Sequence, residues 1–218
     1  MSDYPWRERK KQATRDAIGA AALKLAMELG PENVRVDDIA AAAGVSPRTF
    51  NNYFSSREEA ICAQRLQWAH QLGDAVRARP VTEPLDRALT EAIFEVRGRR
   101  APDRAVIRML AATPAMQAEY LRNAVASEYA LADAIVARTG CDPLGAAVLG
   151  SAYAGAIRAA SEYWLREDGD VPFTDYLRAA LDRVAPAARA LDAAPSPLTQ
   201  SPLTRSPHTQ SNRESQAC

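Results

Sequence analysis

Apolar residues recur every three or four positions along most of the chain, and the strict alternation of a half-buried strand is absent. This pattern predicts an all-α protein. Proline, glycine and capping residues divide the pattern into separate helices. The expected helices cover residues 7–29, 36–43, 47–54, 56–79, 82–99, 103–112, 115–139, 143–168 and 172–184, the last with an alternative end at residue 191, beyond Pro186.

Two of these helices are short and follow each other closely, at residues 36–43 and 47–54. Gly44 stands between them, where a helix often ends with a residue in the left-handed region. Ser46 and Pro47 then supply an N-cap and a first helical residue. A short helix, a tight corner and a second short helix predict a helix-turn-helix unit.

The second short helix has two different faces. Phe50 and Phe54 are four residues apart and therefore share its buried face. The other face carries Arg48, Asn51 and Asn52. Adjacent asparagines are poor helix formers, but Asn can bond adenine and Arg can bond guanine in the major groove. The candidate DNA-contacting residues are Arg35, Ser46, Pro47, Arg48, Asn51, Asn52, Tyr53 and Arg57, with Tyr53 and Arg57 expected at phosphates.

A solvated polar face on a small helical hairpin is the alternative interpretation of this surface. For an isolated Arg-x-x-Asn-Asn sequence, that interpretation would be preferred. The surrounding Gly44, the Ser-Pro pair at residues 46–47 and the Phe-x-x-x-Phe spacing favour a DNA-binding helix instead.

The segment IAAAAGVSPRTFNNYFSSREEAI, residues 39–61, resembles the DNA-binding signature of TetR-type bacterial transcriptional regulators, and the resemblance extends from Arg9. It implies three N-terminal helices, a long fourth helix, and an all-helical domain that binds ligands and dimerises. Two positions depart from the pattern. Arg35 stands where Ser or Thr often caps the first motif helix, and Asn51 stands where an aromatic residue is common. The second departure bears on the operator sequence, not on the binding mode.

Three segments are therefore expected. Residues 1–55 form a helix-turn-helix DNA-binding domain, and residues 56–192 form a helical ligand-binding and dimerisation domain. Residues 193–218 hold three successive five-residue repeats rich in Ser, Pro and Thr. Such a composition cannot bury enough apolar surface to fold, so we expect a disordered, dispensable tail. A phosphorylated or partner-binding tail is the alternative.

The net charge is zero, whereas nucleic-acid binders are often basic. A chain with zero net charge can still bind DNA, because the electric field close to the DNA depends on the local charges more than on the net charge of the whole chain. Basic residues gather close to the motif, at Arg7, Arg9, Lys10, Lys11 and Arg15. Whether this end of the first helix touches phosphate or is simply solvated stays open.

Other functional classes lack their sequence signals. The three cysteines are far apart, which favours a reducing cytoplasm without disulfides, and no cluster has metal-ligand spacing. No apolar run is long enough to cross a membrane. Phosphate-binding glycine loops, Gly-x-Ser-x-Gly elbows and His-Glu-x-x-His motifs are also missing. We therefore expect a cytoplasmic protein that is not an enzyme and needs no metal or cofactor, with a helical enzyme as the remote alternative.

Small residues form a row on the helix at 143–168: Ala147, Gly150, Ser151, Ala154 and Gly155. Such a row lets another helix approach closely. Packing within one subunit is one interpretation. The family resemblance implies the other, a four-helix homodimer interface built with the last helix of each subunit, which suits a palindromic DNA site.

A ligand cavity is expected among the helices that start near residues 85, 103, 115 and 143. Taken individually, each aromatic candidate is more often ordinary core than cavity lining. The C-terminal domain is similar to domains described as acyl-CoA-like ligand-binding, which implies a small apolar or acyl effector. The alternative is a helix-turn-helix activator or architectural protein without an effector. The candidate lining residues are Phe94, Met109, Met116, Tyr120, Tyr129 and Tyr153, with Arg97 and Arg108 as polar anchors.

Overall fold

The computed structural model describes residues 4–98, 103–110, 112–167 and 169–193. Every regular element in these ranges is helical, so the all-α prediction is confirmed. None of the described helices is long and apolar enough to span a membrane. The repeat tail lies outside the described residues. The elements are α1 (Tyr4–Leu29), α2 (Val36–Ala42), α3 (Pro47–Asn51), α4 (Arg57–Ala78), α5 (Leu85–Ile93), the π-helix η1 (Phe94–Gly98), α6 (Arg104–Leu110), α7 (Pro114–Thr139), α8 (Pro143–Arg166) and α9 (Phe173–Ala193).

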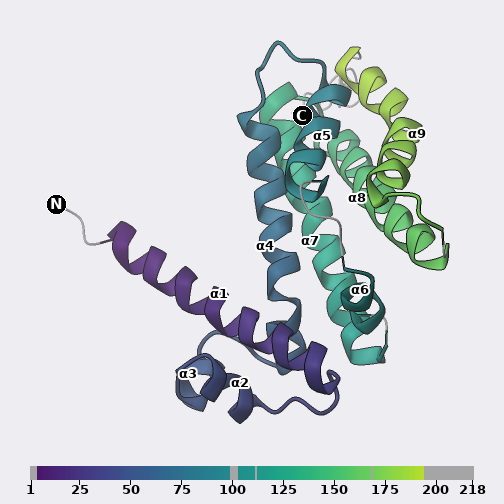
Figure 1. Cartoon of the computed structure of the whole chain (residues 1–218). Coiled ribbons are helices and arrows are strands. Elements are labelled where there is room, and N and C mark those ends of the chain that lie inside the picture. Colours follow the sequence, from purple (N-terminus) through teal and green to yellow (C-terminus); the bar gives the residue numbers. More distant parts are fainter. Residues whose placement is uncertain (1–3, 99–102, 111, 168, 194–218) are drawn as a thin grey trace, which may run out of the picture.

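Helices α1, α2 and α3 form a small module at one end of the molecule (Figure 1). The long helix α4 rises from this module and runs beside α7, α8 packs on α7, and α9 packs on α8 and α5. The N-terminal part of α1 projects away from the body. This arrangement makes α4 the main connection between the small module and the larger helical body.

Helix boundaries follow the local capping chemistry. The Ser56 hydroxyl accepts the N–H of Glu59 at 3.0 Å, and the Glu59 carboxylate accepts the N–H of Ser55 at 2.8 Å, which closes the start of α4. Gly140 ends α7 with a φ of 65°, a left-handed value that suits glycine. Helix α9 continues through Pro186 to Ala193, so the longer of the two expected ends is correct.

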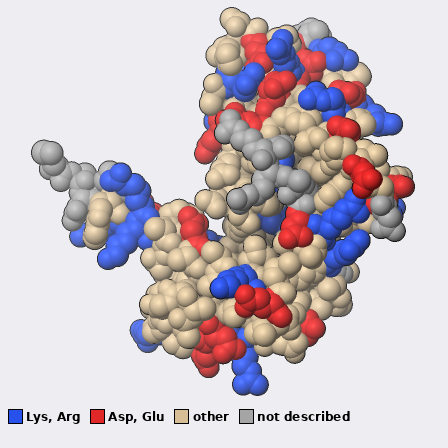
Figure 2. All heavy atoms as spheres, in the orientation of Figure 1, with Lys and Arg blue, Asp and Glu red and all other residues tan. Residues whose placement is uncertain are grey.

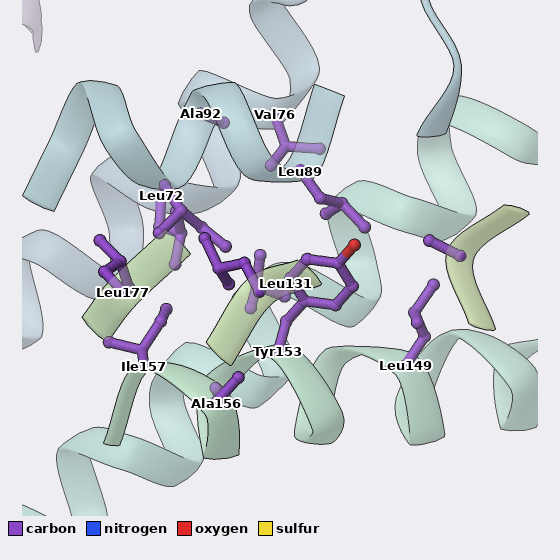
Figure 3. Close-up of a cluster of buried hydrophobic side chains, with 14 of the residues drawn as sticks. Leu72, Val76, Leu89, Ala92, Leu131, Leu149, Tyr153, Ala156, Ile157 and Leu177 are labelled. Carbon is purple, nitrogen blue, oxygen red and sulfur yellow. The ribbon is translucent and has the colours of Figure 1, made fainter. Parts of the chain in front are cut away.

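Two hydrophobic cores stabilise the structure. The larger one joins α4, α5, α7, α8 and α9, and Figure 3 shows part of it around Tyr153. The smaller one holds the N-terminal module together and contains Ile18 and Phe50. It also takes in Met109 from α6 and Met116 from α7, so the module packs directly on elements of the larger body.

Candidate functional site

The corner between α2 and α3 has the geometry that the glycine and the Ser-Pro pair predicted. Gly44 adopts a φ of 67°, and the N–H of Val45 donates to the carbonyl of Ala40 at 2.9 Å. The Ser46 hydroxyl then accepts the N–H of Thr49 at 3.0 Å and caps α3. These local bonds fix how α3 leaves the corner.

The buried side of α3 is set by two aromatic rings. Phe50 and Phe54 are almost fully buried, with ring centroids 5.7 Å apart. Because these rings point into the core, Arg48, Asn51 and Asn52 remain exposed on and just after the helix. The exposed row that the sequence predicted for base contacts is therefore present, next to the exposed Ser46 and Pro47.

Helix α3 is shorter than expected. It ends at Asn51, and Asn52 is its C-cap, whose N–H donates to the carbonyl of Arg48 at 3.2 Å. The prediction of a helix to residue 54 was wrong at this end, because two adjacent asparagines favour leaving the helix over continuing it. Asn52 therefore presents its side chain from a turn, and Tyr53 behind it is half-buried.

Arg35 precedes α2 and is exposed, without a side-chain bond that caps the helix. Two carboxylates in the first turn, Asp37 and Asp38, interact favourably with the positive end of the helix dipole, and this compensates for the missing cap. Arg35 is consequently free of any capping task at this helix start.

Arg57 has internal contacts, in contrast to its expected role at a phosphate. One guanidinium nitrogen donates to the carbonyls of Glu32 and Val34, at 2.9 and 2.8 Å, and another donates to Glu58 at 2.8 Å. These bonds tie the loop between α1 and α2 to the start of α4. The structure thus favours a framework role for Arg57.

Arg15 was expected only within the basic cluster, yet it lies at the junction of three helices. It donates to the carbonyl of Tyr53 at 2.7 Å and to the Glu59 carboxylate at 3.0 Å. Its guanidinium also lies 4.3 Å from the centre of the Phe54 ring. Burial opposes ionisation of Glu59, but hydrogen bonds from Ser55 and Arg15 outweigh it and lower the pKa of this carboxyl. The charged pair therefore locks α1 and the end of α3 onto α4.

The projecting part of α1 carries the basic cluster. Arg7, Arg9, Lys10 and Lys11 are exposed there, and Figure 2 shows their positive charge gathered on this segment. The Lys10 ammonium lies 5.2 Å from the Trp6 ring centre. The local concentration of charge, predicted from the sequence, thus exists despite the zero net charge.

A cavity with two adjoining lobes lies in the larger body. The lobes share Arg65 and Trp68 of α4 and Arg97 of η1. The first lobe has a volume of about 40 Å³ and reaches α7 and α8, where Tyr120 is among its lining residues. The second has a volume of about 210 Å³ and reaches α1 through Leu23 and α6 through two apolar side chains.

The shared wall of the two lobes is strongly positive. The Arg65 guanidinium lies 4.5 Å from the Tyr120 ring centre, and that of Arg97 lies 4.8 Å from the Trp68 ring centre. Burial lowers the pKa of both arginines, and the positive charge of Arg65 lowers the pKa of Arg97 further. Neither arginine forms an ion pair with a carboxylate within the described part of the chain.

The comparisons with known proteins identify both parts of the chain. Residues 18–60 match the family model for bacterial regulatory proteins of the tetR family, and residues 79–189 match that of the MftR C-terminal domain. The second match alone spans more than half of the chain. The chain belongs to the TetR family of transcriptional regulators.

Individual relatives agree with this assignment. The HTH-type transcriptional regulator TcmR of Streptomyces glaucescens is 35% identical over an alignment of 146 residues, and this alignment covers 62% of this chain and 65% of TcmR. The match thus spans slightly less than two thirds of that relative's length. As expected from the sequence, the chain belongs to a class of DNA-binding regulators that are not enzymes.

Solved structures of the TetR family share the fold. The fatty acid degradation regulator FadR of Bacillus halodurans is 18% identical, with a TM-score of 0.51 over 78% of this chain and 94% of that one. A TetR-family transcriptional regulator of Mesorhizobium loti is 16% identical, with a TM-score of 0.51 over 82% and 96%. At this identity, the likeness concerns the fold alone.

Two of the expected cavity residues of this TetR-family chain line the cavity, Arg97 and Tyr120. Tyr153 instead lies fully buried in the larger core (Figure 3), where burial raises the pKa of its hydroxyl to about 12. Phe94 packs against the same core, with the Arg178 guanidinium 4.4 Å from its ring centre. The aromatic side chains thus divide between cavity and core, as the alternative interpretation allowed.

The other four expected cavity residues lie elsewhere. Met109 and Met116 belong to the N-terminal core, because α6 and the start of α7 face the DNA-binding module. Arg108 and Tyr129 are exposed on α6 and α7, with Tyr129 69% exposed. For these helices, periodicity alone did not reveal which neighbour each face would meet.

Cavity residues on α4 were missed by the sequence reasoning. Arg65 and Trp68 lie three residues apart on one face of this helix, and Asn123 and Arg158 line the first lobe. No cavity residue had been predicted on this helix. An arginine within its apolar pattern, one turn before a tryptophan, was the available signal.

The small-residue row on α8 is divided between two environments. A Cβ at Gly150 would lie 2.8 Å from the carbonyl oxygen of Glu128, so this glycine packs closely against α7 of the same subunit. Ala154 lines the cavity. Ala147 and Ser151 are exposed, and nothing lies within 4 Å of a Cβ at Gly155. The intrasubunit interpretation therefore holds for part of the row only.

Proposed function

We propose that this TetR-family regulator is a homodimeric repressor that leaves a palindromic operator when a small hydrophobic or acyl-type ligand binds. The observation that carries the proposal is the placement of the cavity on α4. The N-terminal end of this helix holds the helix-turn-helix module through Arg15, Glu59 and Arg57, and its middle lines the cavity through Arg65 and Trp68.

The DNA-reading role is proposed for the exposed side of α3. Arg48 and Asn51 project from this short helix while the two phenylalanines anchor its other side. Each could make a bidentate contact with a base edge, which is worth about 1–3 kcal/mol of discrimination. Ser46 and Asn52 flank this helix and are exposed, as is Arg35 before α2, and we propose that they add contacts to the same groove or its backbone.

The dimer is proposed to form through α8 and α9. One side of α8 leaves large apolar side chains in solvent, with Leu144 62% and Val148 63% exposed, and Gly155 lies two turns further along. Exposed apolar rows on a helix favour association. A two-fold axis through this surface would present two α3 helices to successive major grooves, about 34–36 Å apart.

The release mechanism is proposed to act through the second lobe of the cavity. Leu23 belongs to α1, Gln64 to α4 and Val106 to α6, and all three line this lobe. A ligand there would touch the DNA-binding module and its supporting helices directly. It would weaken DNA binding only by its preference for the non-binding arrangement, typically about 1–3 kcal/mol.

The first experiment measures binding to the operator and to scrambled DNA. Arg48→Ala and Asn51→Ala should each lose about 1–3 kcal/mol for the operator, while scrambled DNA is bound almost as before. Arg87→Ala is the control, because this exposed arginine lies on α5, distant from the DNA-binding module and outside the proposed dimer interface. Unchanged operator preference in both α3 variants would reject the assignment.

The second experiment addresses dimer and effector. Sedimentation should show a dimer for the wild type and a shift toward monomers for Gly155→Leu. The variant should also lose specific DNA binding in a matched DNA titration. A monomeric wild type that binds one half-site with full affinity would contradict the proposal. A dimer that no cavity ligand releases from the operator would instead favour the activator or architectural alternative.

A further inference from the structure

The unusual feature of the cavity is a pair of arginines, Arg65 and Arg97, for which the described residues supply no counter-charge. Elsewhere in the described chain, arginines with restricted exposure have partners: Arg79 bonds Glu83 at 2.6 Å, and Arg15 bonds Glu59 at 3.0 Å. For Arg65 and Arg97, the described contacts are the faces of two aromatic rings. Both side chains are half-buried, so each charge loses part of its hydration, which is costly without a partner, and the like charge of the other arginine adds to the cost.

The ring contacts orient the guanidiniums without using their hydrogen-bond donors. Stacking engages the flat face of a guanidinium, whereas its N–H groups lie in the plane. No hydrogen bond from either group to another described residue accompanies the stacking. Within the described chain, the N–H donors of the pair therefore have no hydrogen-bond acceptor, and they can bond a ligand that enters the cavity.

Nearby carboxylates do not fill this role. Glu119 is paired with Arg122, and Glu162 is paired with Arg158 at 2.8 Å. Asp103 is the carboxylate among the lining residues, at the second lobe, and it is exposed. The wall shared by the lobes therefore keeps its positive character.

The rest of the cavity is suited to an apolar body. Leu72 and Ile157 line the first lobe, and Val96, Ile107 and Phe173 line the second. The first lobe has a volume of about 40 Å³ and the second about 210 Å³, so the second lobe offers most of the space for the body of a small ligand. Charge at the junction and apolar walls on either side describe a site for an amphipathic ligand.

We propose that the effector is an organic anion, whose carboxylate or phosphoryl group is held by Arg65 and Arg97 while its apolar body occupies the adjoining lobes. The proposal rests on the ligand-binding role given to this cavity above. Carboxylate and phosphoryl oxygens match the forked geometry of a guanidinium, and such charge-assisted bonds are about twice as strong as neutral ones. Anion binding also supplies the missing counter-charge, so it stabilises the cavity wall.

The test uses matched probes that differ in charge. Calorimetric titration of the full chain without DNA would compare 2-naphthoate with its neutral isostere 2-naphthamide, and decanoate with decanamide. Naphthyl phosphate distinguishes a phosphoryl from a carboxylate preference. We expect each anion to bind about 10- to 100-fold more tightly than its neutral partner, as two charge-assisted hydrogen bonds imply.

Two variants locate the effect. Arg65→Gln and Arg97→Gln should each remove most of the preference for the anion while leaving amide binding nearly unchanged. Arg77→Gln makes the same change on α4 outside the cavity and should keep the wild-type preference. In the absence of ligand, the two cavity variants should melt at the same temperature as the wild type or higher, since each removes an unpaired charge.

Equal binding of acid and amide would overturn the proposal, as would an anion preference that both cavity variants retain. Failure of every anion to bind at millimolar concentration would overturn it too. Operator release, measured separately, tests the function. Anions that bind without releasing DNA would support the anion site but contradict the ligand-driven release. Neutral ligands that release DNA as well as the anions do would support the release but contradict the anion site.

Discussion

Two glycines on α8 offer a matched test of the packing between helices. A Cβ at Gly150 would lie 2.8 Å from the Glu128 carbonyl oxygen and 3.0 Å from the Ala132 nitrogen, both backbone atoms of α7. Five residues later, a Cβ at Gly155 would meet nothing within 4 Å in the subunit. The same substitution, Gly→Ala, therefore adds one methyl group to a tight contact or to open space.

The two variants should differ in stability by about 1–3 kcal/mol. Alanine gains about 1 kcal/mol of helix propensity over glycine at either position. At Gly150 the methyl group also forces α7 and α8 apart, and overpacking typically costs about 1–3 kcal/mol. The net result for Gly150→Ala is a loss of about 0–2 kcal/mol, while Gly155→Ala gains up to about 1 kcal/mol.

Thermal unfolding at several protein concentrations would measure this difference. For a chain of this length, 1 kcal/mol corresponds to about 2–4 °C in Tm. Varying the protein concentration separates the stability of the subunit from that of the dimer, because only dimerisation makes Tm depend on protein concentration. If Gly150→Ala melts at or above the temperature of Gly155→Ala, the close approach of α7 and α8 is not a constraint and the reasoning fails.

Three further predictions concern the N-terminal module. Arg57→Ala should lower Tm and weaken binding to operator and scrambled DNA alike, because its bonds to the carbonyls of Glu32 and Val34 are internal; a variant with wild-type Tm and a defect confined to DNA would contradict this. Cys62 is buried and its thiol pKa is raised to about 12, so alkylation at pH 8 should follow unfolding; rapid labelling of the native protein would refute it. The lowered pKa of Glu59 stabilises the fold above the unfolded pKa, and this contribution disappears as pH falls through the folded value. The stability difference between wild type and Glu59→Gln in urea titrations should therefore shrink below about pH 4.5, and a constant difference would argue against an ionic role.

Local signals predicted the elements whose determinants are near in sequence. Gly44 and Gly140 end helices in the left-handed region, and Ser46, Ser56 and Thr113 cap the helices that follow them. Each of these features depends on a few neighbouring residues, so one sequence is enough to recognise it. The exposed row on α3 followed in the same way from the spacing of two phenylalanines.

Features that depend on packing between distant parts of the chain were harder to predict from the sequence. Met109 and Met116 joined the N-terminal core instead of the cavity, because the position of α6 is set by contacts that no local pattern records. The π-helix that carries Arg97 gave no separate signal, although such turns often occur at functional sites. Arg15 could be assigned to a basic cluster, but its bond to Tyr53 spans 38 positions.

Helix α6 shows how the cavity and the DNA-binding module could be coupled. Ile107 packs in the larger core and lines the second lobe, whereas Met109 and Leu110 pack in the N-terminal core. A displacement of this short helix by a ligand must therefore repack the core beneath α1 and α3. Because packed cores adopt discrete arrangements and do not deform continuously, a small shift at the cavity can select between two positions of the module. The coupling between ligand and DNA would then depend on α6 as well as on the long helix α4.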